Sequence, residues 1–261
     1  MLELSHISKT FNPGTVNEKR ALSELTLRLE PGEFATIIGS NGAGKSTLFN
    51  AICGSFLVDT GSIRLAGQDI TFQPEYQRAR CIGRLFQDPM RGSAPGMTIE
   101  ENLALAAGSG GWFSHMTGRD RARFRDQLAL LDMGLEDRMK QPVGLLSGGQ
   151  RQALTLLMAT INPPKLLLLD EHTAALDPGT AEKVLHVTRE VVDRHKITTL
   201  MVTHNMQQAL DMGSRTLMMD SGRIVLDVKG KERAGMTVND LLEKFHTGTG
   251  KALNNDRILL S

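Results

Sequence analysis

The sequence predicts an α/β fold in which helices cover a mainly parallel sheet, with an antiparallel β-subdomain at the N-terminus and an inserted α-helical subdomain. Three observations predict this class. The N-terminal third alternates apolar and polar residues between turns, as half-buried strands do. Residues from about 90 to 145 carry helical segments. From Lys165 onward the pattern runs strand, helix, strand, helix, which is typical of parallel strands joined by covering helices.

The first predicted elements are strands and one helix, several of which end at glycine or proline. They are a strand that begins with Leu2, Leu4 and Ile7, a strand over 25–29 before the turn at Pro31-Gly32, a buried strand over 34–38 before Gly39, a helix over 45–53 before Gly54, and a hairpin of 62–65 with 69–70. The later predicted elements are a helix near 119–133 with Phe124, Leu128 and Leu131 on one face, strands over 166–170 and 199–203, a helix between them with Val184, Val187 and Val191 on its face, a hairpin over 217–227, and a helix over 237–245 with Thr237 as N-cap.

These elements predict a domain division. Residues 1–245 are predicted to form a single domain, and about 88–150 to form the inserted helical subdomain. Residues 246–261 are rich in Gly, Thr and Asn and are predicted to be a flexible C-terminal tail. Gly108 to Gly111 predicts a flexible loop inside the helical part.

Composition narrows the class of protein. The chain has 261 residues, of which 40% are hydrophobic and 23% charged, as in ordinary globular proteins. A net charge of +1 argues against nucleic acid as the main partner. The longest aliphatic run, Leu166 to Leu169, is too short to cross a bilayer, and the N-terminus does not resemble a signal peptide. Cys53 and Cys81 fit no metal-ligand spacing. We therefore expect a cytoplasmic protein.

A glycine-rich loop between the predicted strand 34–38 and helix 45–53 carries the first chemical signal. Two glycines five positions apart are followed by Lys45 and Ser46. The glycines let backbone N–H groups point at phosphates, Lys45 reaches the β- and γ-phosphates, and the Ser46 hydroxyl can hold Mg²⁺. The motif predicts a P-loop NTPase core, whose nucleotide-binding residues are Gly39, Ser40, Asn41, Gly42, Ala43, Gly44, Lys45, Ser46 and Thr47. A similar stretch at 248–251 lacks the spaced first glycine and the following Ser or Thr, and we reject it.

Two acids follow the leucine run at 166–169. Four consecutive leucines predict a strand buried on both faces, and ligands of such sheets bind at the carboxyl ends of the strands. Asp170 is placed to hold Mg²⁺ through its water shell. Glu171 is placed to polarise the attacking water, as general base or as its orienter. The alternative interpretation is a solvated loop, which the upstream phosphate loop disfavours.

A second anion-binding element lies far along the chain. Residues 146–150 read Leu-Ser-Gly-Gly-Gln. The glycines leave N–H groups unshielded, Ser147 can cap the following helix, and a helix N-terminus attracts anions.

The ordered series of motifs resembles the ATP-binding subunits of ABC transporters over roughly residues 1–245. The series consists of the phosphate loop, 146–150, Asp170-Glu171, Ala175-Leu176-Asp177-Pro178 and His204. The resemblance implies that Phe11 stacks on adenine, that Gln87 touches Mg²⁺ and the water, and that His204 contacts the γ-phosphate. Taken alone, each of these three residues could instead have a structural role.

The same resemblance implies a dimer. Ser147, Gly148, Gly149 and Gln150, with Asp177, would act in trans on the ATP held by a second copy, so that a homodimer encloses the nucleotides. The implied partners are transmembrane permease subunits, docked on the helical subdomain, and an extracytoplasmic substrate-binding protein. The implied location is peripheral, at the cytoplasmic face of the inner membrane. Residues 145–178 resemble importer ATPases, including ones associated with aromatic amino acids such as tryptophan or tyrosine.

Several alternatives stay open. His172 stands where most relatives of this family have Pro, and we favour a packing role for it over catalysis. A basic run of arginines at 119, 121, 123 and 125 could contact lipid headgroups. The acids interleaved with them favour the alternative, a helix face exposed to solvent. Competing functions are an exporter or mechanotransmission ATPase, a DNA-repair or ribosome-associated ATPase, and a degenerate domain that only binds ATP. The absence of long coiled coils, the near-zero charge and the intact motif residues favour an importer ATPase.

Overall fold

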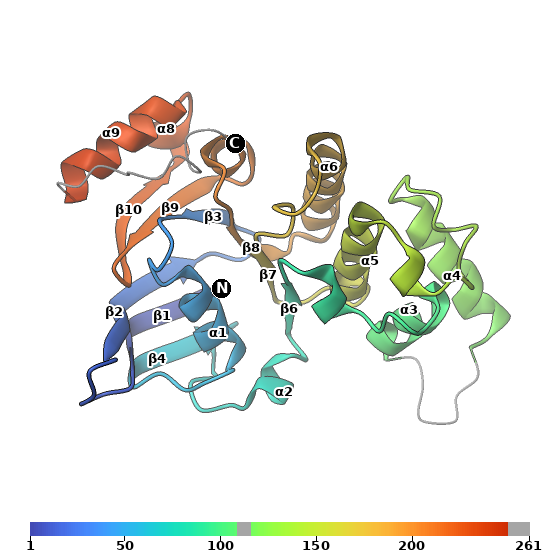
Figure 1. The fold of residues 1–261 in the computed structure, drawn as a ribbon, viewed down its shortest axis with the longest axis horizontal. Helices are drawn as coiled ribbons and strands as arrows, with labels where there is room; N and C mark the ends of the chain where they lie inside the picture. The colour runs from blue at the N-terminus through green and yellow to red at the C-terminus, as the bar shows by residue number, and fades with distance from the viewer. Residues whose placement is uncertain (109–115, 250–261) are drawn as a thin grey trace. The chain divides into compact units, whose positions relative to one another are not determined.

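The computed structural model describes residues 1–108 and 116–249, and it divides the chain into two compact units (Figure 1). Unit 1 contains residues 1–82, 165–171 and those from 196 onward, while unit 2 contains 83–164 and 172–195. Among the described helices, none has both the length and the apolar character that a membrane span requires.

Unit 1 begins with an antiparallel sheet, as predicted. Its strands are β1 (Leu2–Phe11), β2 (Lys19–Leu29), β4 (Thr60–Leu65) and β5 (Gln68–Asp69), in the order β2-β1-β4-β5. Leu2 on the central strand β1 pairs with Leu29 on one side and Leu65 on the other. All three leucines are buried, because alternate residues of each strand face the core.

The second sheet of unit 1 is mainly parallel and has the order β10-β9-β3-β8-β7-β6. Its strands are β3 (Phe34–Ile38), β7 (Leu166–Asp170), β8 (Thr198–Val202), β9 (Arg215–Asp220), β10 (Arg223–Lys229) and, at the edge where unit 1 ends, β6 (Ile82–Leu85). Strand β3 is parallel to both β8 and β9, and β8 is parallel to β7. The carboxyl ends of β3, β7 and β8 therefore meet at one edge, as the α/β prediction requires.

Helix α1 (Lys45–Cys53) follows β3 and covers the main core of unit 1. Its Leu48, Phe49 and Ile52 belong to one buried cluster with Leu166 and Leu168 of β7. The helix ends at Gly54, which has φ of 82° and is the left-handed C-cap that the sequence predicts. This packing fixes the helix that begins at the phosphate loop.

The end of α1 has a second support. The fully buried side chain of Arg78, in α2 (Glu75–Arg78), donates Nη1 hydrogen bonds to the carbonyls of Ala51 and Ile52, at 2.8 and 2.9 Å. Its Nη2 and Nε atoms donate to the carbonyls of Thr71 and Gln73, each at 2.9 Å. A buried cation at the C-terminal end of a helix complements the helix dipole. Arg78 therefore stabilises α1 from the end opposite to the loop.

The C-terminal part of unit 1 packs around a smaller apolar cluster. The helices here are α7 (Met206–Asp211), α8 (Gly230–Arg233) and α9 (Val238–Thr249), and α8 and α9 lie beside β10 (Figure 1). Ile38 at the end of β3 joins this cluster with Met206 of α7 and Leu241 and Phe245 of α9. The cluster thus connects the strand that precedes the phosphate loop with the C-terminal helices.

Unit 2 is helical. It contains α3 (Ile99–Ala107), α4 (Gly118–Ala129), α5 (Gly148–Thr160) and α6 (Pro178–His195), with the 3₁₀ turns η1 (Pro89–Gly92) and η2 (Val143–Leu145). Helices α3, α4 and α5 each begin with a capping box, in which the N-cap hydroxyl and the side chain three residues on satisfy each other's backbone N–H groups. Because α6 packs against α5, the unit extends beyond the predicted limits of about 88–150.

Some predicted boundaries are wrong. Helix α4 ends at Ala129 instead of near 133, since Leu131 reaches its buried site from a turn that continues to Asp132, with φ of 51°. Helix α9 runs to Thr249, so the first four residues of the predicted tail are helical, while 250–261 lie outside the described residues. On α6, Val192 is buried and Val191 only half-buried. Gly108 ends α3, and the rest of the predicted loop falls in the undescribed stretch.

Candidate nucleotide-binding site

The phosphate loop joins β3 to α1 as the sequence predicts, and two of its glycines are required by the backbone. Gly39 has φ of 155°, and a Cβ atom there would overlap the carbonyl oxygen of Met219. Gly44, the N-cap of α1, has φ of 104°, and its Cβ would lie 2.6 Å from the carbonyl oxygen of Ala21. Only glycine fits both conditions. Between them the loop exposes Asn41 and Gly42, and Ser46 is exposed in the first turn of α1.

Lys45 is the buried cation of the loop. Its side chain folds back so that Nζ donates to the carbonyl oxygens of Gly39, at 2.6 Å, and Ser40, at 3.1 Å. Burial lowers the pKa of Lys45 from its ordinary value, while the carboxylates of Glu171 and Asp170 act in the opposite direction. The phosphate loop and the two acids at the carboxyl end of β7 therefore form one electrostatic site in unit 1.

Two of the three predicted catalytic residues of unit 1, Glu171 and His204, are in direct contact, and the third is Lys45. Nε2 of His204, which follows β8, lies 2.6 Å from Oε1 of Glu171, which follows β7. The pairing of Asp170 with Val202 in the parallel ladder places both strand ends at one level, and the Glu171 N–H donates to the Val202 carbonyl at 3.0 Å. Glu171 has φ of 48°, a left-handed conformation that is uncommon outside glycine. The contact brings an acid and an imidazole to the edge of the sheet where the loop lies.

A network that the sequence interpretation missed surrounds His204. Thr203 Oγ1 donates to Gln208 Oε1 at 3.0 Å and accepts the Asn205 N–H at 3.1 Å. The Asn205 side chain caps α7 by accepting the Gln208 N–H at 2.9 Å. The signal available in the sequence was Asn205 three residues before Gln208, a local N-cap pattern. Both neighbours of His204 are therefore fixed in place.

Phe11 lies at the end of β1 and is half-buried. Its ring meets that of Phe56 edge to face, with centroids 5.3 Å apart and an interplanar angle of 85°. Lys9 Nζ lies 5.8 Å from the centroid of the Phe11 ring and pairs with Asp59 at 2.7 Å. This arrangement supports the ring on one edge, which suits a stacking platform and also suits the alternative of a packed aromatic. Stacking of Phe11 on adenine stays a prediction.

The predicted trans-acting residues lie in unit 2. Ser147 caps α5: its Oγ accepts the Gln150 N–H at 3.3 Å, and Gln150 Oε1 accepts the Ser147 N–H at 3.2 Å. Ser147 and Gly148 are exposed, whereas Gly149 is buried, and a Cβ at Gly149 would overlap the Thr180 side chain. The capping predicted for Ser147 is confirmed, and its contact with nucleotide stays a prediction.

Asp177 and Gln87 are also in unit 2. Asp177 Oδ1 accepts the Thr180 N–H at 3.0 Å at the start of α6, and hydrogen bonds from Thr180 hold the pKa of this carboxyl below its ordinary value. Gln87 is exposed just after β6. Asp177 is therefore ionised and positioned at a helix start, where a carboxylate is favourable.

The donor set of unit 1 fits a nucleoside triphosphate with Mg²⁺. Ser46 and Asp170 offer a hydroxyl and a carboxylate oxygen, the hard ligands that Mg²⁺ prefers. The loop from Gly39 to Gly44 leads into the N-terminus of α1, where phosphate binds favourably. With Lys45 beside them, these groups match the charge and chemistry of bound phosphates.

Comparison with known proteins agrees with this site. The family model described as ABC transporter matches residues 22–174. The chain is 44% identical over 252 residues, 94% of this chain and 98% of the relative, to a tyrosine transport ATP-binding protein of Clostridioides difficile. It is 34% identical over 212 residues, 81% of this chain and 87% of the relative, to a high-affinity branched-chain amino acid transport ATP-binding protein of Pseudomonas aeruginosa.

Solved structures give the same result. A dimeric ATP-binding cassette in a post-hydrolysis state bound to ADP and Pi matches with a TM-score of 0.75 at 27% identity, covering 88% of this chain and 98% of that chain. An ATP-binding cassette of an ABC transporter in its ADP conformation matches with a TM-score of 0.77 at 25% identity, covering 95% and 98%. Fold, motif series and relatives agree, and the chain belongs to the ABC transporter family as one of its ATP-binding subunits.

Proposed function

We propose that this chain binds and hydrolyses Mg²⁺-ATP and that, as a dimer, it powers substrate import through a membrane permease. The observation that carries the proposal is the 2.6 Å contact between Glu171 and His204. The Glu171 carboxylate also interacts electrostatically with Lys45 of the phosphate loop. An acid and an imidazole next to a phosphate cradle are the groups that phosphoryl transfer to water requires.

Each residue has a chemical task in this proposal. Backbone N–H groups of 39–46 and the Lys45 ammonium hold the phosphate oxygens, and a charge-assisted contact of this kind is stronger than a neutral one. Glu171 accepts the proton of the attacking water or orients it, and His204 fixes the Glu171 carboxylate and contacts the γ-phosphate. Ser46 and Asp170 would hold Mg²⁺, with Gln87 as the further ligand that the family resemblance implies, and the bound ion would neutralise the charge on the phosphates.

The exposed start of α5 supports the proposed dimer. Ser147 and Gly148 present the N-terminus of a 13-residue helix to solvent, and this end attracts anions. In the proposal it covers the ATP held by the loop of a second copy, together with Gly149, Gln150 and Asp177. The γ-phosphate then stabilises the closed dimer, and its loss on hydrolysis shifts the population to the open one.

The work of this cycle is transferred to partners. Two of the relatives described above are named as ATP-binding proteins of tyrosine transport and of branched-chain amino acid transport. On this support we assign the chain to an amino-acid importer, with tyrosine or another aromatic amino acid as substrate. It would act at the cytoplasmic face of the inner membrane, bound to two permease subunits and served by an extracytoplasmic substrate-binding protein.

The test has two stages. The purified chain is first assayed for phosphate release from ATP with and without Mg²⁺, and Mg²⁺-dependent turnover supports the ATPase. The chain is then reconstituted with a candidate amino-acid permease in proteoliposomes containing ATP, and labelled tyrosine, leucine and spermidine are supplied with the binding protein. Uptake of tyrosine above the other two supports the assignment. Turnover without uptake of either amino acid contradicts the importer, and absence of turnover contradicts the ATPase.

A further inference from the structure

Arg233, the last residue of α8, ties the C-terminal segment to the end of α7. Its guanidinium donates to four oxygens, those of the Ala209 carbonyl (3.0 Å), the Leu210 carbonyl (2.6 Å), the Met212 carbonyl (3.0 Å) and the Thr216 hydroxyl on β9 (2.9 Å). Three of these acceptors are backbone carbonyls at or just beyond the last turn of α7. The Ala209 carbonyl also accepts the hydroxyls of Thr36 and Thr216, at 2.9 and 3.1 Å, so Arg233 belongs to a set of polar contacts that hold this end of α7.

Helix α7 depends on such contacts because it is short. It has six residues, and an isolated helix of that length is not stable in water. A cation at the C-terminal end complements the helix dipole, and the planar fork of arginine can bond several oxygens at once. The conformation of α7 is consequently set from outside the helix, by Arg233 with the hydroxyls of Thr36 and Thr216 at one end and by the Asn205 cap at the other.

The N-terminal end of α7 leads directly to the site. His204 lies between Thr203 and Asn205, which are bonded to each other and to Gln208 of α7. On the inner side, Met206 and Ala209 pack in the apolar cluster that includes Ile38. A displacement of α7 would therefore move the backbone on which the His204 side chain is carried, and with it the 2.6 Å contact to Glu171.

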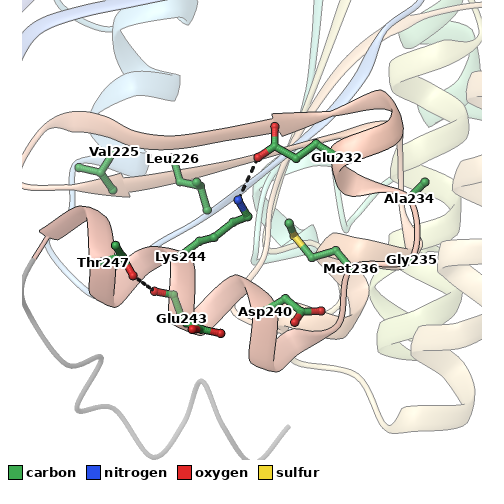
Figure 2. A pocket seen from close by; sticks show the side chains of 10 residues that line it. All are labelled: Val225, Leu226, Glu232, Ala234, Gly235, Met236, Asp240, Glu243, Lys244 and Thr247. Carbon is green, nitrogen blue, oxygen red and sulfur yellow. Dashed lines mark hydrogen bonds and ion pairs between the residues drawn. The ribbon is translucent and has the colours of Figure 1, made fainter.

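The other attachments of α8 are weaker. Residues of α8 and the following turn line one wall of a surface groove of about 750 Å³, opposite α9 (Figure 2). Across it, Lys244 of α9 pairs with Glu232 at 3.0 Å, but the two side chains are 41% and 55% exposed. An exposed ion pair of this kind contributes little to stability. The multiple hydrogen bonds of Arg233 are thus the main polar connection between α8 and α7.

We propose that Arg233 is a positioning residue for ATP hydrolysis, which holds α7 and thereby sets His204 against Glu171. The inference rests on the proposed ATPase function. It concerns a residue that touches neither nucleotide nor Glu171, and its effect passes through His204. It predicts that loss of the guanidinium slows the chemical step while nucleotide binding is retained.

The test measures the steady-state ATPase kinetics of Arg233→Gln and of two control variants. Lys231→Gln removes a positive charge from an exposed position of the same helix, and Lys244→Met breaks the ion pair across the groove. Arg233→Gln should lower kcat about tenfold, as expected when a reacting group is misplaced, and leave the KM for ATP within about twofold. Both controls should keep the wild-type kcat. Arg233→Lys, which retains the charge with fewer donors, should recover part of kcat and serves if the glutamine variant does not fold.

A double mutant separates this role from general support of the fold. In a His204→Ala background, Arg233→Gln should cause no further loss of kcat, because its effect requires the imidazole. An equal loss in both backgrounds, or an unchanged kcat in folded Arg233→Gln and Arg233→Lys, would overturn the inference. Failure of the proposed function is distinguishable, since wild-type protein would then release no phosphate.

Discussion

The imidazole of His172 donates its Nε2–H to Thr188 Oγ1, 3.3 Å away inside unit 2. The direction follows from the threonine, whose single hydroxyl proton is given to the Val184 carbonyl at 2.7 Å. His172 is thus held as the Nε2–H tautomer, and among the described residues its buried Nδ1 has no hydrogen-bond partner. The packing role expected for His172 agrees with this neutral, fully buried ring.

Burial gives His172 a predictable effect on stability. It lowers the pKa of His172 from 6.5 to about 4. Between these values the unfolded chain binds a proton that the folded chain does not, so the free energy of unfolding rises with pH across this window. We expect acidification from about pH 7 to about pH 4 to remove up to roughly 3 kcal/mol through this group. Urea unfolding of wild type and His172→Pro at a series of pH values measures the difference.

The proline variant is the control for that experiment, because it removes the titrating ring and leaves every other ionisable group. Parallel pH dependences of the two proteins would contradict the prediction. Since His172 has no assigned chemical task, the same variant should keep ATPase activity within about threefold at neutral pH. A complete loss of turnover with retained folding would instead give the ring a catalytic task.

Glu171→Gln should abolish phosphate release and leave an ATP-bound dimer. The amide keeps the size of the side chain but cannot accept the proton of the water, so the closed state should accumulate. Light scattering after gel filtration with Mg²⁺-ATP measures the dimer. Glu190→Gln, at an exposed position of α6, should turn over ATP as wild type does. A Glu171→Gln protein that hydrolyses ATP as a monomer excludes the mechanism.

Lys45→Ala should weaken ATP binding by at least about thirtyfold, because phosphates then lose a buried, charge-assisted partner. Calorimetric titration with ATP measures the dissociation constant. Lys183→Ala removes a lysine from an exposed position of α6 and should leave the constant unchanged. Equal affinity in the two variants would show that the loop lysine is not a phosphate ligand.

Ser147→Asp separates the capping role of the serine from its predicted role in trans. Aspartate is as good an N-cap as serine, so the melting temperature should hold. The added negative charge should repel the γ-phosphate of the second copy and prevent dimer formation in the Glu171→Gln background. Thr98→Ala provides the opposite control, since loss of the cap of α3 should cost about 1 kcal/mol but leave the dimer intact. A full yield of dimer with Ser147→Asp would contradict a contact in trans.

Local rules explain why much of the site was predictable from sequence. The strand over 34–38, the loop from Gly39 and the helix ending at Gly54 depend on neighbouring residues and on glycine geometry, and the structure reproduces their limits. The four leucines of β7 are all fully buried, as an apolar run in a central parallel strand requires. Ser147 caps α5 by the same local logic.

Contacts between distant segments were less accessible to sequence. The Glu171–His204 contact arises because β7 and β8 are parallel neighbours, and only the family resemblance suggested a shared site. Arg233 was missed because it binds mainly backbone carbonyls, which every residue has and no pattern marks. Helix α4 ended early because a turn could bury Leu131 equally well, which periodicity alone does not reveal.

The left-handed backbone at Glu171, with φ of 48°, sets the stability of the fold against the activity proposed for this residue. Such a conformation costs an L-amino acid roughly 1 kcal/mol that glycine does not lose. A glycine at 171 would relieve this strain, but it would remove the contact with His204 and the carboxylate to which the proposal assigns the activation of water. The backbone strain at this position therefore coincides with the residue to which we assign the activation of water, as strained residues in functional sites commonly do.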